Sequence, residues 1–147
     1  IQRMPKQSNK IFALPQDAPY LSVCSTSTHD MTPIRAWWLE NRQLTQQYYN
    51  EVLELEGEAP EQCEPWIAEQ IIRQHVASNA MWVILPWQDW MAMDGDLRQE
   101  DPWSERINIP SDPQHFWSYR MHMNLEDLLK ATSFNEKIKK INNNRYD

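Results

Sequence analysis

The sequence has 147 residues, enough for one domain with a hydrophobic core. Its net charge of −7 disfavours binding to nucleic acids or membrane surfaces, since both attract basic patches. With only 2 glycines it has no glycine-rich phosphate loop, and no apolar run approaches the roughly 20 residues that span a bilayer.

Two short apolar segments have the pattern of β-strands. Residues 20–24, YLSVC, lie between a proline and a hydroxyl-rich run, and residues 80–86, AMWVILP, are continuously apolar. Such runs are typical of strands buried on both faces. Residues 1–20 are predicted to form an extended loop with a short strand at Lys10–Leu14.

Helical patterns lie between and after these strands. The spacing of apolar residues predicts a helix over 33–56, with Thr32 as N-cap and Gly57 beyond its end. A second helix is predicted over 60–76 or 65–76, because a proline suits the first helical position.

The C-terminal part of the chain has a different composition and is predicted to contain more loop. Residues 87–123 are rich in Asp, Pro and Trp, and are predicted to form loops and short helical turns. Asn124 is the expected N-cap of the following helix. Residues 130–147 are predicted to be a fraying helical tail with three apolar residues at helical spacing, Phe134, Ile138 and Ile141.

The order of strand, helices and strand predicts an α/β fold with parallel strands covered by helices. Two strands do not make a stable parallel sheet, so the pattern indicates a piece of a larger fold. In such folds active sites lie at the carboxyl ends of strands. His29 and Asp30 follow the first strand at that end. A helix cap or turn is the alternative role for Asp30.

The segment around this pair, SVCSTSTHDMTPIRAWWLE, resembles the His–Asp segment of the 4-alpha-glucanotransferases of glycoside hydrolase family 77, also called amylomaltases or disproportionating enzymes. It is most similar to the maltose-handling plant-cytosolic and bacterial branch. Residues 2–6, 80–90 and 105–129 resemble further segments of the same family. The resemblance implies a (β/α)8 TIM barrel. Residues 1–147 are then a C-terminal piece of its catalytic domain, with strands seven and eight and their helices.

The same resemblance implies retaining transfer of α-1,4-linked glucosyl or maltosyl units between glucans, maltose and glucose, without a cofactor. Asp30 matches the carboxylate that stabilises the transition state, and His29 matches a histidine that hydrogen-bonds the same sugar. The nucleophile and the acid/base, which retaining chemistry also needs, have no counterpart here. The chain alone is therefore expected to be inactive and to need the remaining barrel as its partner.

Other residues have two possible roles. Asn108 matches a residue near the acceptor sugar, but Asn108 and Arg106 equally fit a purely structural role in their loop. Trp103 and Trp117 are candidates for stacking on sugar rings, whereas four tryptophans are expected in the core, Trp37, Trp38, Trp66 and Trp82. Gln88 and Asp89 are expected to tie the second strand to its loop.

The remaining chemistry-bearing residues suggest no further site. Cys24 and Cys63 fit neither a metal motif nor a disulfide framework, which favours buried, reduced thiols in a cytoplasmic protein. His75 and His122 have no partners at metal-ligand spacing, so no metal site is expected. A non-catalytic carbohydrate-binding or protein-interaction module is the alternative function, because the chain has 8 tryptophans and lacks a recognisable nucleophile.

Overall fold

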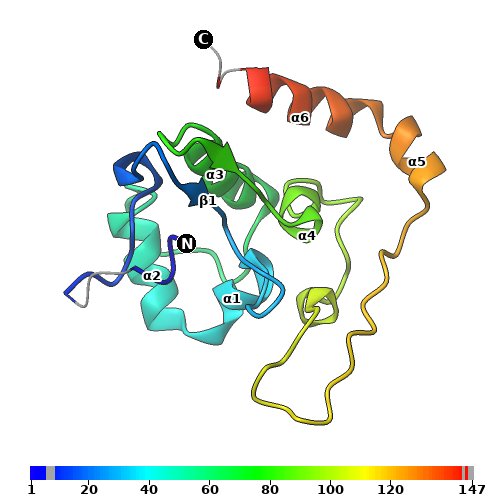
Figure 1. Cartoon of the computed structure of the whole chain (residues 1–147), viewed down its shortest axis with the longest axis horizontal. Coiled ribbons are helices and arrows are strands. Elements are labelled where there is room, and N and C mark those ends of the chain that lie inside the picture. The colour runs from blue at the N-terminus through cyan, green and yellow to red at the C-terminus, as the bar shows by residue number, and fades with distance from the viewer. Residues whose placement is uncertain (6–8, 144, 146–147) are drawn as a thin grey trace.

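The computed structural model describes residues 1–5, 9–143 and 145. Its elements run from a short 3-10 turn to a C-terminal helix (Figure 1). They are, in chain order, η1 (Pro15–Asp17), β1 (Val23–Cys24), α1 (Ile34–Glu40), α2 (Arg42–Glu51), α3 (Pro65–Val76), β2 (Trp82–Val83), α4 (Trp87–Met91), η2 (Pro102–Glu105), α5 (Leu125–Lys130) and α6 (Thr132–Asn143).

The two strands pair in parallel, as the sequence predicts, with Val23 opposite Trp82 and Cys24 opposite Val83. They are much shorter than predicted, and they are not buried on both faces. Val23 is 51% exposed and Trp82 is 62% exposed. The sheet has two strands in the described part of the chain, so it offers little surface for covering layers. The prediction of a strand at Lys10–Leu14 is wrong, because these residues form a loop.

The single helix predicted over 33–56 is wrong, because the chain turns at Asn41. The backbone of Asn41 is extended (φ −149°), and its side chain accepts the N–H of Leu44 at 3.0 Å, so Asn41 caps the new helix α2. The hydroxyl of Thr45 then donates to the carbonyl of Trp38 across the corner. Apolar spacing alone did not reveal the break, because α1 and α2 both contribute to one core.

The ends of these helices also differ from expectation. Thr32 is not an N-cap, because its hydroxyl donates to Glu40 at 2.6 Å and the cap position belongs to Pro33. Helix α2 ends at Glu51, well before Gly57. Helix α3 begins at Pro65, the second of the two predicted starts, and α5 has Asn124 at its N-cap position as predicted.

Helices α1, α2, α3, α4 and α6 all contribute buried side chains to one core. Trp37 and Trp38 are buried in it as predicted, and both make edge-on ring contacts with Tyr48. Trp66 and Trp82 were predicted to be buried but are 47% and 62% exposed. Trp66 occupies the first turn of α3 and Trp82 the uncovered face of β2, which explains both errors.

The C-terminal segment runs along the outside of the molecule before its last helix packs against the core. After η2 the chain runs as a long extended loop along the outside to α5, and α6 then packs near α3 (Figure 1). Phe134 and Ile141 of α6 are buried in the core, so the predicted tail is a docked helix as far as Asn143. Its predicted fraying end lies largely outside the described residues. No helix in the described part of the chain is long and apolar enough to cross a membrane.

Candidate active site

Parallel pairing brings the segments that follow the two strands to the same edge of the sheet. Residues 25–33 follow β1 and carry His29 and Asp30, while β2 leads into α4, which carries Asp89. This edge is where parallel α/β folds place their ligand sites. The arrangement therefore fits the position that the sequence predicted for the His–Asp pair.

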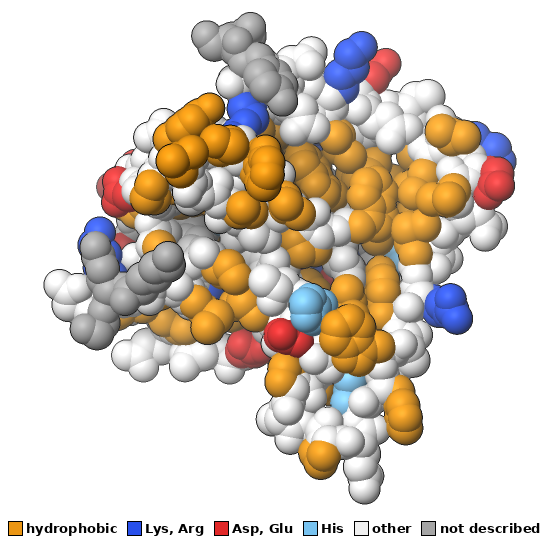
Figure 2. Space-filling view, viewed as in Figure 1, with side chains coloured by type: hydrophobic (Ala, Val, Ile, Leu, Met, Phe, Trp, Pro, Cys, Tyr) orange, Lys and Arg blue, Asp and Glu red, His pale blue; other side chains and the backbone are white. Residues whose placement is uncertain are grey.

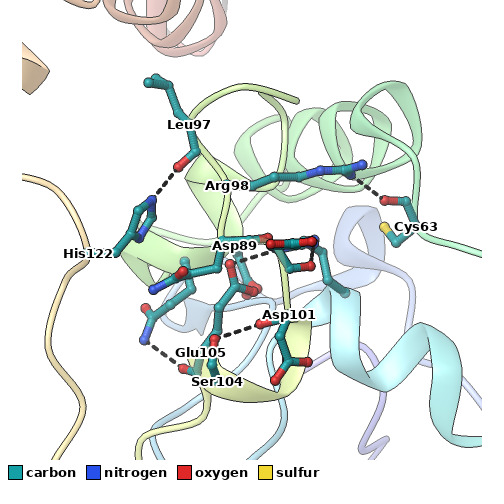
Figure 3. Close-up of polar contacts among 12 residues, drawn as sticks. Cys63, Asp89, Leu97, Arg98, Asp101, Ser104, Glu105 and His122 are labelled. Atoms are coloured by element: carbon teal, nitrogen blue, oxygen red, sulfur yellow. Dashed lines mark hydrogen bonds and ion pairs between the residues drawn. The ribbon is translucent and has the colours of Figure 1, made fainter.

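Asp89 holds the loop 25–33 from inside. Its side chain is fully buried and accepts hydrogen bonds from the hydroxyls of Thr26 (2.5 Å) and Ser27 (2.7 Å) and from the N–H of Ile34 (2.8 Å). A buried carboxylate needs such donors to offset its lost hydration. Asp89 thus fixes the hydroxyl-rich run and the start of α1. Its role is structural, but it holds the loop that follows β1, whereas the prediction was that it ties β2 to its own loop. Figure 3 shows Asp89 near the buried Glu105.

Arg3 holds the same loop from the other side. One guanidinium nitrogen donates to the carbonyls of Thr26 (3.1 Å) and Thr32 (2.9 Å), near the two ends of the turn. The guanidinium also lies over the ring of Trp37, 5.0 Å from its centroid. The turn between these anchors presents His29 and Asp30 toward solvent, and their side chains are 51% and 50% exposed.

A second loop closes on this turn. The side-chain amide of Asn108 donates to Asp30 Oδ1 at 2.6 Å, and its backbone N–H donates to the carbonyl of His29 at 3.0 Å. His29 Nε2 lies 3.3 Å from Asp30 Oδ2. Carboxylate, imidazole and amide therefore form one cluster from two segments that are far apart in sequence.

Buried charge anchors this second loop to α1. Glu105, at the end of η2, pairs with Arg35 at 3.0 Å, and both side chains are buried. Arg35 also donates to the carbonyl of Gln99 at 2.7 Å, and Gln88 donates to that of Glu105 at 3.2 Å. Figure 3 shows Glu105 among these contacts, beside the η2 turn in which the Ser104 hydroxyl donates to the carbonyl of Asp101.

Glu105 gives the fold a pH dependence. Burial, opposed by Arg35, raises the pKa of Glu105 from its ordinary value of 4.5 to about 7. Between these pH values the folded protein holds a proton that the unfolded chain releases, so this group lowers stability as the pH rises. Glutamine does not titrate. Glu105→Gln in the whole protein is therefore expected to remove this decline, measured as the melting temperature at pH 5 and at pH 7.5.

The matched control for this prediction is Glu136→Gln, because Glu136 is exposed in α6. The control variant is expected to keep the pH profile of the parent protein. A Glu105→Gln variant whose melting temperature falls with pH as steeply as the parent's would contradict the role given to Glu105.

An indole completes the cluster. The ring of Trp117 lies 4.9 Å from that of His29, centroid to centroid, with an interplanar angle of 43°. Trp117 is 63% exposed. Figure 2 shows hydrophobic side chains beside a histidine and an acidic side chain on the face that it presents. The site therefore offers a flat apolar surface next to polar groups.

The structure brings together some of the predicted site residues and leaves others outside. Among the described residues, His29, Asp30 and Asn108 are in direct contact, whereas Arg106 shapes the loop by donating to the carbonyl of Asn108 at 3.0 Å. Trp103 lies in η2, with its backbone N–H bound to Asp101. The anchoring roles of Arg3 and Arg35 were missed, because no local sequence signal marks a long-range ion pair or a bond to a distant carbonyl.

The cluster suits the recognition of a polar, hydroxylated ligand. The carboxylate of Asp30 is a half-exposed acceptor of hydrogen bonds, and its position is fixed by Asn108 and His29. In the described part of the chain, no three His, Cys, Asp or Glu side chains gather in a way that holds a metal ion. Both cysteines are free and buried, and burial raises the pKa of each thiol.

The fold and site thus define part of an α/β protein with a polar site at the carboxyl edge of parallel strands. Comparison with known proteins agrees with this description of the fold. The model of glycoside hydrolase family 77, described as 4-alpha-glucanotransferase, matches residues 1–126. The chain therefore belongs to this family, and the resemblance seen in the sequence is confirmed.

Individual relatives agree with the family match. The 4-alpha-glucanotransferase DPE2 of Oryza sativa subsp. japonica is 36% identical over 141 residues, which are 96% of this chain and 15% of that protein. A 4-alpha-glucanotransferase of Chlamydia pneumoniae is 31% identical, over 92% of this chain and 25% of its own length. The chain thus spans only a small part of the relatives that it matches.

A solved structure supports the fold. The amylomaltase from Streptococcus agalactiae in complex with acarbose has a TM-score of 0.65 to this chain, with 20% sequence identity. The likeness covers 90% of this chain and 23% of the amylomaltase chain. The fold of this chain is therefore that of a part of an amylomaltase.

Proposed function

We propose that this chain contributes the Asp30 carboxylate to a retaining 4-alpha-glucanotransferase, as the C-terminal part of its (β/α)8 barrel, with β1 and β2 as strands seven and eight. The observation that carries the proposal is the cluster of His29, Asp30 and Asn108 at the carboxyl edge of the parallel strands. The membership of the chain in family 77 supports the reaction. The substrates that we propose are α-1,4-glucans, maltose and glucose.

Each residue of the cluster has a place in this chemistry. In a retaining transfer the sugar passes through states with oxocarbenium character, so the negative charge of Asp30 stabilises them more than it stabilises the ground state. His29 orients Asp30 and hydrogen-bonds hydroxyls of the same sugar, whereas Asn108 orients Asp30 and lies near the acceptor sugar. Arg106 holds the loop of Asn108. The exposed indole of Trp103 contacts glucan further from the reacting bond.

The nucleophile and the acid/base of the reaction come, in this proposal, from other strands of the same barrel. They stand about 5–5.5 Å apart in retaining enzymes. The exposed faces of β1 and β2 fit this arrangement, because neighbouring strands would cover Val23 and Trp82. We place the enzyme in the cytoplasm, where buried free thiols such as Cys24 and Cys63 are common.

The test is an assay of the whole protein with maltose and glycogen. Transfer is expected to release glucose and to lengthen glucan chains, and NMR of the first products is expected to show retained α-configuration at C1. A protein that binds glycogen but releases no glucose would instead be a carbohydrate-binding module. A protein that neither binds nor converts glucan would overturn the proposal entirely.

A further inference from the structure

We propose that Trp117 is a sugar-stacking platform of this site, on which the apolar face of a pyranose ring of the glucan lies. The inference rests on the proposed function for the identity of the sugar. It names a residue to which neither the family match nor the relatives assign a role. Three features of the described residues carry it: exposure, position and anchoring.

The first feature is the exposure of a large apolar ring. Trp117 is 63% exposed and its neighbour Phe116 is 78% exposed. An indole left in water forgoes roughly 25 cal/mol for each Å² of apolar surface that it does not bury. Large exposed apolar surface beside polar groups is typical of binding sites.

The second feature is position. The ring of Trp117 contacts that of His29, and His29 in turn contacts Asp30, which accepts the amide of Asn108. The indole therefore borders the cluster through His29. A pyranose has an apolar C–H face and a rim of hydroxyl groups. The cluster matches both, with an aromatic face for the C–H surface and polar groups for the hydroxyls. The net charge of −7 disfavours a nucleotide as the stacked ligand.

The third feature is anchoring of the loop that carries the indole. His115 Nε2 lies 2.9 Å from the carbonyl of Ile107, and the N–H of Ser118 donates to the carbonyl of Phe116 at 2.8 Å. Asn108 ties the start of the same loop to His29. A platform that is already in place costs less entropy on binding than a mobile side chain.

The test compares three variants of the whole protein. Trp117→Ala is expected to raise the KM for glucan and the Kd for a maltooligosaccharide about fivefold, the change in Kd that corresponds to a loss of about 1 kcal/mol of ring stacking. Trp117→Phe keeps an aromatic face and is expected to restore most of the affinity. Phe116→Ala is the matched control, because Phe116 is more exposed and none of the ring contacts found among the described residues involves it.

The outcomes separate this inference from the proposed function. An unchanged Kd in Trp117→Ala would overturn the platform. A fall in kcat with unchanged KM and Kd would also overturn it, because Trp117 would then only orient His29. The Kd is measured without turnover. A protein that shows no glucan transfer but loses maltooligosaccharide affinity in Trp117→Ala would therefore refute the transferase and keep the platform.

Discussion

Asp30→Asn in the whole enzyme is expected to lower kcat for glucan transfer about a hundredfold or more, the usual effect of losing one preorganised electrostatic contact. Asparagine has the shape of aspartate, and its oxygen still accepts the amide of Asn108. The substitution therefore removes the negative charge and little else. The melting temperature is expected to stay close to that of the parent, because Asp30 is half-exposed and its turn is held by Arg3 and Asp89.

The experiment measures glucose release from maltose with glycogen as acceptor, together with thermal unfolding. Asp96→Asn is the matched control, because Asp96 is exposed and accepts none of the hydrogen bonds found among the described residues. Near-parental turnover in Asp30→Asn would leave Asp30 with only the role of a turn residue. A large loss of both turnover and stability would show that the carboxylate is needed for the fold instead.

At Asp89, in contrast to Asp30, a substitution is expected to lower the stability of the protein. Asp89→Ala removes the acceptor of three hydrogen bonds, from Thr26, Ser27 and the N–H of Ile34, at a fully buried position. Each buried donor left without a partner costs about 1–3 kcal/mol. The change is therefore expected to destabilise this part of the protein by about 3 kcal/mol or more, and to lower the apparent melting temperature and the soluble yield of the whole protein.

Asp89→Asn is expected to be milder, because an amide oxygen still accepts the N–H of Ile34 and the two hydroxyls can reorient. Asp96→Ala again serves as the control, with a melting temperature close to that of the parent. The measurements are thermal unfolding and hydrogen exchange of residues 25–34. A parental melting temperature and unchanged exchange in Asp89→Ala would show that the three bonds contribute nothing to stability.

The sequence was most informative where local chemistry decides the structure. Proline at a helix start located α3, and an asparagine cap located α5. It was least informative where tertiary contacts decide. The corner at Asn41 and the exposed face of Trp82 depend on which surfaces meet a neighbour, and an apolar spacing does not encode the neighbour.

The candidate site, too, has a part that local sequence predicts and a part that depends on tertiary contacts. His29 and Asp30 were predictable from their place after a strand and from the family resemblance, but their contacts with Asn108 and Trp117 were not. The buried pair of Arg35 and Glu105 joins residues 70 positions apart, and nothing near either residue marks the other. Sequence reasoning thus located the candidate site residues and missed most of the contacts that hold them in place.

The hydrogen bond between Asn108 and Asp30 also has a consequence for biosynthesis, because it spans 78 residues. Closing a chain segment of that length costs about 4 kcal/mol of entropy, by the logarithmic dependence on length. A ribosome adds roughly 5–20 residues per second, so the His–Asp turn emerges several seconds before its partner. During that interval His29 and Asp30 have no Asn108 to orient them. The assembled cluster therefore first appears late in translation, once the second loop has been made and has docked on α1.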